Sequence, residues 1–172
     1  CYNCAGTVER TLDSLAAQTL KEIELIVIND GSTDNTLDVL NAYKEAHPEL
    51  LMNLYTKENE GIAEARNFGL RKVTGEYFGF LDSDDYTDPE MYAVLYRKAK
   101  EDDYEMVVSD FWWVNSKGEK REKEGPYEPG PDMMVKLFAV LWNKIYRSDL
   151  LKRVARKLRD ADAPHPFCFS ED

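Results

Sequence analysis

The sequence predicts an α/β fold, with a mostly parallel central sheet flanked by helices on both faces. Segments with helical periodicity alternate with short apolar segments typical of buried strands from residue 5 to residue 114. Acidic residues follow two of these strands, and ligands of open parallel sheets bind beyond the carboxyl ends of strands. The chain has 172 residues, 43% of them hydrophobic, so we expect a single domain with one sizeable core.

The first half of the chain sets the alternation. Residues 5–20 carry apolar side chains at every third or fourth position, which predicts an amphipathic helix. Residues 22–30 form a β-branched, nearly continuous apolar run, typical of a strand buried on both faces. A second helix is expected to begin near Asp34, which can cap it, and to end at Pro48.

The second half continues the pattern more weakly. Asp88 and Pro89 predict a helix start, because proline suits the first turn and the residue before it avoids the helical region. The other expected elements are a strand at 51–56, a helix at 62–73, a strand at 76–81, the end of the Asp88 helix near residue 100, a strand at 105–114, a hairpin turn at 115–120, a loop at 125–132 and a short helix at 131–138.

Both ends of the chain indicate a fragment. A sheet of this kind normally has a strand before its first helix, whereas loop 1–6 has no strand in front of it. The last residues, Ser170 to Asp172, stand inside what looks like a motif. We therefore expect residues 1–172 to be one catalytic domain that lacks its first strand and its C-terminal continuation.

Composition excludes several classes of partner. The net charge of −11 repels phosphate backbones and argues against a nucleic acid partner. Three cysteines do not form a disulfide framework, which favours a reducing compartment, the cytoplasm. We find no apolar run of about 20 residues and no secretory signal pattern.

The segment after the strand at 76–81 contains the strongest chemical signal. Asp82 and Asp84 are spaced to present two carboxylates to one hard cation, which prefers oxygen ligands. The alternative is a solvated turn in which Asp88 caps the next helix. Taken alone, the Asp-x-Asp spacing does not decide between them.

Two other loops carry related patterns. Asp30 ends the strand at 22–30, and Gly31 and Ser32 make a tight turn after it. Arg66 lies near the start of the helix at 62–73, where it could reach a base or a phosphate. The alternatives are an ordinary strand–helix loop and a surface arginine.

Together these motifs resemble the large inverting family of glycosyltransferases with the GT-A fold, family two. The matching residues cover nearly the whole chain in the family's order; position 1 is Cys where the family commonly has proline. They are "YN" at 2–3, "NDGSTDNT" at 29–36, "NEGIAEARNFGL" at 59–70, "GEYFGFLDSDD" at 75–85, "WNKIYR" at 142–147 and the terminal "ED".

The resemblance implies a nucleotide-sugar donor, most readily a UDP-sugar. Tyr2 is expected to lie against the uracil ring, Asp30 to accept a hydrogen bond from the base, and Arg66 to lie close to the nucleotide. Asp82 is expected to approach the ribose and the sugar. The same motifs place Asn3, Gly31, Ser32 and Ser83 among the donor-binding residues.

The resemblance also implies the catalytic parts. Asp84 is expected to hold Mn²⁺ or Mg²⁺ against the diphosphate, and Asp172 to be the general base. A bound metal stabilises the charge on a departing diphosphate, and a carboxylate can take the proton of the acceptor hydroxyl. The implied reaction is sugar transfer with inversion to a glycan or lipid-linked acceptor, in bacterial cell-surface polysaccharide or glycolipid synthesis.

Two other functions remain open at this point. A non-catalytic module could use the same residues to bind a nucleotide or glycan without a base. A sugar nucleotidyltransferase also combines an α/β sheet with a metal, but loop 1–6 lacks the glycine-rich loop with nearby Arg and Lys that such enzymes usually show.

Three further segments have competing interpretations. Cys1 and Cys4 form a C-x-x-C pair without enough nearby ligands for zinc. Trp112 or Trp113 could stack on an acceptor sugar or simply pack on the sheet. Residues 146–160 combine an apolar stripe with many basic residues, which suits either peripheral membrane contact or a solvated helix face.

Overall fold

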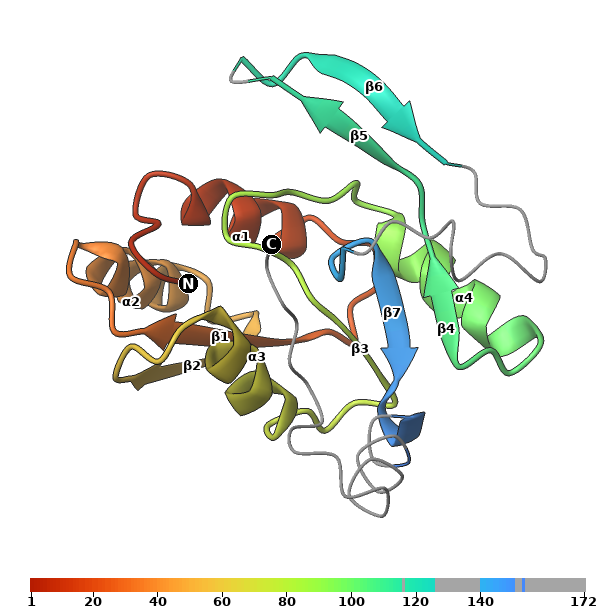
Figure 1. The fold of residues 1–172 in the computed structure, drawn as a ribbon, viewed down its shortest axis with the longest axis horizontal. Coiled ribbons are helices and arrows are strands. Elements are labelled where there is room, and N and C mark those ends of the chain that lie inside the picture. The colour runs from red at the N-terminus through yellow and green to blue at the C-terminus, as the bar shows by residue number, and fades with distance from the viewer. Residues whose placement is uncertain (116, 126–139, 151–152, 154–172) are drawn as a thin grey trace.

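A computed structural model describes residues 1–115, 117–125, 140–150 and 153 (Figure 1). Helices and strands alternate through its first half, as predicted. The helices are α1 (Val8–Ala16), α2 (Thr36–Ala46), α3 (Ile62–Leu70) and α4 (Met91–Glu101). The strands are β1 (Glu24–Asp30), β2 (Leu51–Lys57), β3 (Tyr77–Gly79), β4 (Met106–Val108), β5 (Phe111–Val114), β6 (Lys120–Glu124) and β7 (Lys144–Arg147).

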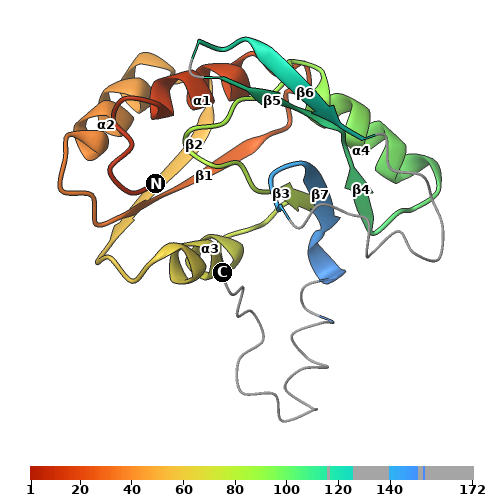
Figure 2. The same ribbon diagram turned by 45° about the horizontal axis from the view of Figure 1, so that its top comes forward.

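Helices cover both faces of the parallel pair formed by β1 and β2. Figure 2 shows α1 and α2 on one side of these strands and α3 on the other. The core between α1, α2 and the strands contains Val8, Leu12, Leu25, Leu40 and Met52. Full burial of each such side chain stabilises the fold by about 2 kcal/mol. This arrangement confirms the predicted α/β class.

The second half of the sheet is less parallel than predicted. β7 lies between β3 and β4 and pairs antiparallel with both. It comes from the motif at 142–147, to which sequence periodicity assigned no strand. Ile145 of β7 packs with Leu95 and Ala99 of α4 in a second core cluster. Among the described strands, parallel pairing is therefore confined to β1 and β2.

The single strand predicted at 105–114 is in fact two strands in different sheets. β4 pairs with β7, whereas β5 pairs with β6 in a hairpin that stands away from the body (Figure 1). The strand β4 ends just before Ser109. The Ser109 amide donates to Asn143 O at 2.8 Å, and Asn143 Nδ2 donates to Ser109 O at 2.9 Å. This tie to a distant residue ends β4, and the alternation of apolar side chains does not reveal it.

Several predicted boundaries shift by a few residues. α1 is shorter than the predicted helix at 5–20, and α3 ends at Leu70 rather than near 73. α4 begins at Met91, not at Asp88, because Asp88 Oδ1 accepts a hydrogen bond from Glu90 N at 3.0 Å in a turn that precedes the helix. The hairpin expected around 115–120 is confirmed by β5 and β6.

Some expectations fall partly or wholly outside the described residues. The short helix at 131–138 and most of the helix at 146–160 lie there. Tyr146 and Arg147 belong to β7 rather than to a helix, which corrects the start of that segment. None of the described helices is both long enough and apolar enough to cross a membrane.

The first residue pairs with β1 on the edge opposite β2. Cys1 N donates to Ile28 O at 2.7 Å, and Asp30 N donates to Cys1 O at 2.9 Å. This is the hydrogen-bond pattern of one rung of a parallel ladder. Within the described chain, β1–β2 and β3–β7–β4 are separate sheets, and the expected additional strand remains a prediction.

Candidate functional site

Loop 1–6 is fastened to the loop that follows β1. Asn3 Oδ1 accepts hydrogen bonds from Thr33 N at 2.8 Å and from Asp34 N at 3.3 Å, and Asn3 N donates to Ser32 Oγ at 3.0 Å. Asn3 has a φ of 49°, a left-handed conformation that asparagine tolerates better than most residues. Asn3 and Ser32 therefore shape the loops, while the neighbouring Tyr2 side chain remains 51% exposed.

Gly31 allows two loops to approach closely. Its φ is +68°, and a Cβ at this position would lie 2.7 Å from Asn59 N. Only glycine has both the backbone freedom and the absence of a side chain that this approach requires. The loop before α3 can therefore lie directly against the end of β1.

Asp30 holds that loop in place. It is 2% exposed, forms an ion pair with Lys57 Nζ at 2.7 Å, and accepts hydrogen bonds from Glu60 N at 3.3 Å and Gly61 N at 3.0 Å. Burial alone would raise the pKa of this carboxyl, but these partners outweigh burial and hold the pKa below its ordinary value. Since a carboxylate has about four acceptor positions, Asp30 keeps acceptor capacity beyond its three donors.

Arg66 connects α3 to the loop after β3. Its Nη2 donates to Asp82 Oδ1 at 3.1 Å in a partly buried ion pair. Because guanidinium groups bind carboxylates and phosphates with the same geometry, Arg66 can also bind a phosphate group. The structure thus brings Arg66 and Asp82 together.

The acidic loop after β3 concentrates negative charge. Asp84 is exposed and Asp85 is partly buried. Burial raises the pKa of the Asp85 carboxyl to about 6, with help from the neighbouring charges of Asp84 and Asp82 and against the pull of Arg10. A cation bound here would relieve this repulsion. Ser83 lies between the acids in the same loop.

The donor set fits a divalent metal only in part. Within the described ranges, no group of three or more His, Cys, Asp or Glu side chains is arranged to hold a metal ion. Mg²⁺ and similar ions are, however, commonly held by one or two carboxylates together with substrate phosphates and water. Asp84, with its exposed carboxylate beside Asp82, fits that kind of site.

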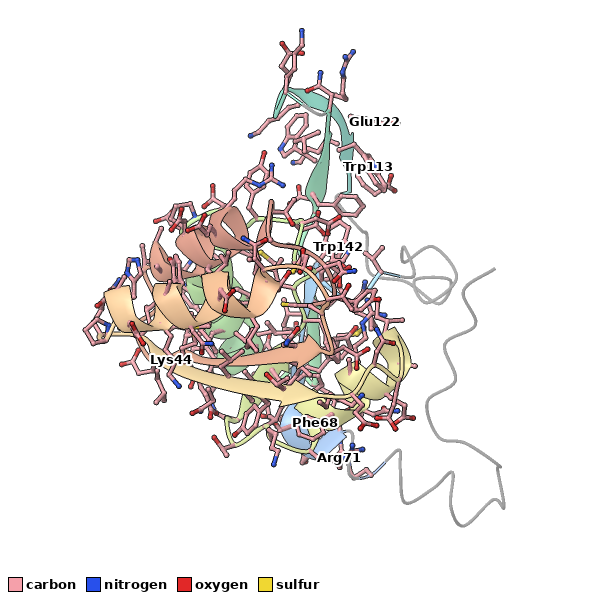
Figure 3. All side chains as sticks on the ribbon, turned by 90° about the vertical axis from the view of Figure 1, so that its left-hand side faces the viewer. Lys44, Phe68, Arg71, Trp113, Glu122 and Trp142 are labelled. Atoms are coloured by element: carbon pink, nitrogen blue, oxygen red, sulfur yellow. The ribbon has the colours of Figure 1, made fainter. Side chains whose placement is uncertain are left out.

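Asp172, the predicted base, lies outside the described residues. Trp112 and Trp113 lie on β5, on the hairpin. Figure 3 shows Trp113 and Glu122 on this hairpin and Trp142 at its base.

Sequence reasoning missed two residues that support the site. Lys57 is the direct partner of Asp30 in the β1–β2 register. A basic residue at the end of the next predicted strand could therefore have indicated a partner for Asp30. Arg10 of α1 donates a hydrogen bond to the main-chain oxygen of Asp84, and no local pattern links the two.

The sequence matches the profile of the family described as Glycosyl transferase family 2 over residues 1–165. The chain belongs to glycosyltransferase family 2. This confirms the resemblance drawn from the motifs, all of which except the terminal Glu171 and Asp172 lie within the matched stretch.

Curated proteins similar to this chain include two from Escherichia coli. "Uncharacterized glycosyltransferase YibD" of strain K12 is 32% identical over 164 residues, covering 87% of this chain and 47% of that protein. "UDP-Glc:alpha-D-GlcNAc-diphosphoundecaprenol beta-1,3-glucosyltransferase WfaP" is 45% identical over 85 residues, covering 49% of this chain and 33% of that protein. The chain spans about half the length, or less, of the curated relatives it matches.

The fold is also similar to that of a solved structure. Residues 1–349 of Staphylococcus aureus TarS, crystallised in complex with UDP, are similar to this chain with a TM-score of 0.69 and 27% identity. The match covers 94% of this chain and 46% of the TarS chain. The GT-A type α/β fold expected from the motifs is thereby confirmed.

Proposed function

We propose that this family 2 domain transfers a sugar from a UDP-sugar to a hydroxyl acceptor, with inversion. The observation that carries the proposal is the ion pair between Arg66 and Asp82 of the acidic loop, two residues before the exposed Asp84. Such a site can bind a diphosphate through one fixed cation and one bound metal. The name of WfaP and the UDP and UDP-GlcNAc complexes of TarS support UDP as the nucleotide.

The nucleotide half of the donor would use the loops around β1. Tyr2 offers an exposed ring for stacking on uracil, next to the braced Asn3. Asp30 retains an acceptor position for a base N–H, and its ion pair with Lys57 keeps it ionised. Arg66 would exchange part of its contact with Asp82 for the diphosphate.

The diphosphate half would use the acidic loop. Asp84 would hold Mn²⁺ or Mg²⁺, with Asp82 near the ribose and sugar. When bound, the metal supplies positive charge that stabilises the departing diphosphate. In the part of the chain that the structure describes, Arg66 pairs with Asp82 and Arg10 opposes the rise in the pKa of Asp85, and a metal bound together with its substrate would supply further positive charge.

The acceptor half of the reaction needs a base. We assign this role to Asp172, which would remove the proton of the acceptor hydroxyl on the face of the sugar opposite the diphosphate. Displacement from that face inverts the anomeric centre. Asp172→Asn is expected to abolish turnover and leave UDP binding intact. Retained turnover in this variant would show that Asp172 is not the base, and UDP binding without turnover in the wild type would indicate a binding module.

The hairpin is our candidate for contact with a glycan acceptor. Trp113 is 44% exposed. The centre of its ring lies 5.4 Å from the centre of the Phe111 ring, and the ring centres of Phe111 and Trp142 are 4.5 Å apart. Glu122 is the cross-strand partner of Trp113 and shares its face of the hairpin. Aromatic rings beside carboxylates suit the apolar faces and hydroxyl groups of sugars.

The wider role follows from the relatives. We propose a part in bacterial cell-surface polysaccharide or glycolipid synthesis, on the cytoplasmic side of the membrane. Residues 146–160 would provide peripheral contact with a membrane that carries a lipid-linked acceptor. In the described part of that segment, Arg147 pairs with Asp103, Glu105 and Asp149, so its charge is already engaged.

The deciding experiment is calorimetric titration of UDP into the full-length protein with Mn²⁺ and then with chelator, with GDP as the competing nucleotide. We expect metal-dependent binding that favours UDP and at least a tenfold loss of affinity in Asp84→Asn. Asp88→Asn is the matched control, because Asp88 is an exposed carboxylate four residues further along. Equal binding by the wild type and Asp84→Asn would disprove the metal assignment.

A further inference from the structure

One side of α1 carries polar side chains that face the acidic loop. We call Thr11, Ser14 and Gln18 the α1 polar stripe; Thr11 and Ser14 lie within α1, and Gln18 follows its last residue by two positions. Their spacing of three and four residues places them on one face of a helix. The segment opposite them, residues 84–89, begins at Asp84.

The stripe binds the main chain of that segment at successive residues. Thr11 Oγ1 donates to Asp85 O at 2.7 Å, and Ser14 Oγ accepts from Thr87 N at 3.1 Å. Thr11 is 5% exposed, so water does not compete for its hydroxyl. These bonds fix the backbone on the C-terminal side of Asp84.

Gln18 is the centre of this network. It is 1% exposed, and its Nε2 donates to Asp88 O at 2.7 Å and to Thr87 Oγ1 at 3.0 Å. Its Oε1 accepts from Tyr92 N at 3.2 Å, at the start of α4. One buried amide therefore joins α1, the acidic segment and α4.

Arg10 extends the same side of α1 toward the acids. Its guanidinium donates to the main-chain oxygen of Asp84 and lies 4.9 Å from the centre of the Tyr86 ring. It thus holds the loop through its backbone and leaves the Asp84 carboxylate without a hydrogen bond or ion pair from the described residues. The carboxylate stays available to a cation.

We propose that the α1 polar stripe positions the metal-binding carboxylate, with Thr11 and Gln18 as positioning residues for Asp84. The inference rests on the proposed function. Asp82, Asp84 and Asp85 repel one another, so an unsupported loop would spread when no cation is bound. Hydrogen bonds from a rigid helix hold the loop in its binding geometry beforehand, which lowers the cost of capturing the metal and the diphosphate.

The test compares two hydroxyl deletions, one in α1 and one in the neighbouring helix α2. Thr11→Val keeps the shape of the side chain and removes its bond to Asp85 O. Tyr43→Phe is the control, because Tyr43 OH donates to Asp13 Oδ1 of α1 at 2.9 Å, away from the acidic loop. In the full-length protein we expect Thr11→Val to raise the Mn²⁺ concentration for half-maximal UDP binding about tenfold, and Tyr43→Phe to leave it unchanged.

A purely structural role for Thr11 predicts something different. Both variants would then lower the thermal midpoint and leave the Mn²⁺ requirement at the wild-type value, which would overturn the inference. Gln18→Met provides a second variant, expected to shift the Mn²⁺ requirement in the same direction as Thr11→Val.

Failure of the proposed function gives a separate result. If the wild type showed no metal-dependent UDP binding, the proposed function would be wrong. Hydrogen exchange at the amides of residues 84–88 would then test the positioning role of Thr11. We expect faster exchange there in Thr11→Val than in Tyr43→Phe. Equal exchange rates in the two variants would overturn the positioning role.

Discussion

At the scale of single residues, several residues of the candidate site stabilise the fold. Asp30 is held by Lys57 and by two amides before α3, and Asn3 braces the loop after β1. The donor would therefore meet side chains that are already fixed, which reduces the entropy lost on binding. Substitutions here will change stability as well as affinity, and the two effects need separate measurement.

The Asp30–Lys57 pair predicts a specific dependence of stability on pH. Burial opposes ionisation of Asp30, but Lys57 and the two amides outweigh it and lower the pKa of the carboxyl below its ordinary value of 3.8. The stability supplied by this lowered pKa is present above pH 3.8 and is lost as the pH falls below it. We expect Asp30→Asn to cost about 2 kcal/mol at pH 7, with the difference from wild type shrinking below pH 4.

Urea unfolding of both proteins between pH 7 and pH 2.5 would measure this. Glu101→Gln is a suitable control, because Glu101 forms an ion pair with Lys98 in which both side chains are about half exposed. A stability difference between wild type and Asp30→Asn that stayed constant down to pH 2.5 would show that ionisation of Asp30 does not contribute.

The sequence pointed to the proposed donor-binding residues more directly than to the residues that support them. Asp30, Arg66 and Asp82 stand in recognisable motifs, and the structure brings Arg66 and Asp82 into contact. Arg10 and Gln18 carry no such signal, because their partners lie about 70 residues further along the chain. Local patterns report which side chains are present but not which distant backbone they bind.

At the scale of elements, the β5–β6 hairpin presents two different faces. Trp113 shares one face with Phe111, whereas Trp112 points to the opposite face, where Lys120 Nζ lies 5.0 Å from the centre of its ring. The two tryptophans are almost equally exposed, at 45% and 44%. They therefore form a matched pair for testing which face meets an acceptor.

We expect Trp113→Ala to raise the KM for a glycan acceptor about tenfold with little change in the affinity for UDP. Loss of ring stacking on a sugar would account for a change of this size, roughly 1.4 kcal/mol. Trp112→Ala should leave the acceptor KM near the wild-type value. Steady-state kinetics with the acceptor varied would decide, and equal effects of both substitutions would remove the face-specific assignment.

The sequence located most elements but not every break between them. Helical and strand periodicity placed α1, β1, α2 and β2 within a few residues of their observed bounds. The division of 105–114 into β4 and β5 was missed, because it depends on the bonds between Ser109 and Asn143. Both strands consist of apolar side chains, so only the tertiary contact separates them.

At the scale of the whole molecule, charge opposes the donor. The net charge of −11 repels a diphosphate at long range, and only local cations such as Arg66 attract it. With chelator present, we expect UDP binding to strengthen on the order of threefold as NaCl rises from about 20 to 200 mM, because salt screens this repulsion.

Uridine provides the control for the salt prediction, since it has the base and ribose but no phosphate. Its affinity should not change over the same range of salt. If UDP binding weakened with salt in the absence of metal, attraction by nearby cations rather than repulsion by the net charge would dominate the electrostatics of the site.

Fold class was predictable from the sequence, whereas strand order was not. The alternation of helix and strand, together with the acids at strand ends, indicated an α/β domain and the edge of the sheet that carries the candidate site. The position of β7 between β3 and β4 is a property of distant pairing. No local periodicity distinguishes a strand that joins in parallel from one that joins antiparallel.

The central place of β7 also has a consequence for synthesis on the ribosome. β1 and β2 can pair once residue 57 has emerged, because both lie early in the chain and join across a single helix. β3 and β4 have β7 as their shared partner, and β7 ends at Arg147. Until then the nascent chain carries two apolar strands with open edges, the condition under which chains aggregate or recruit chaperones.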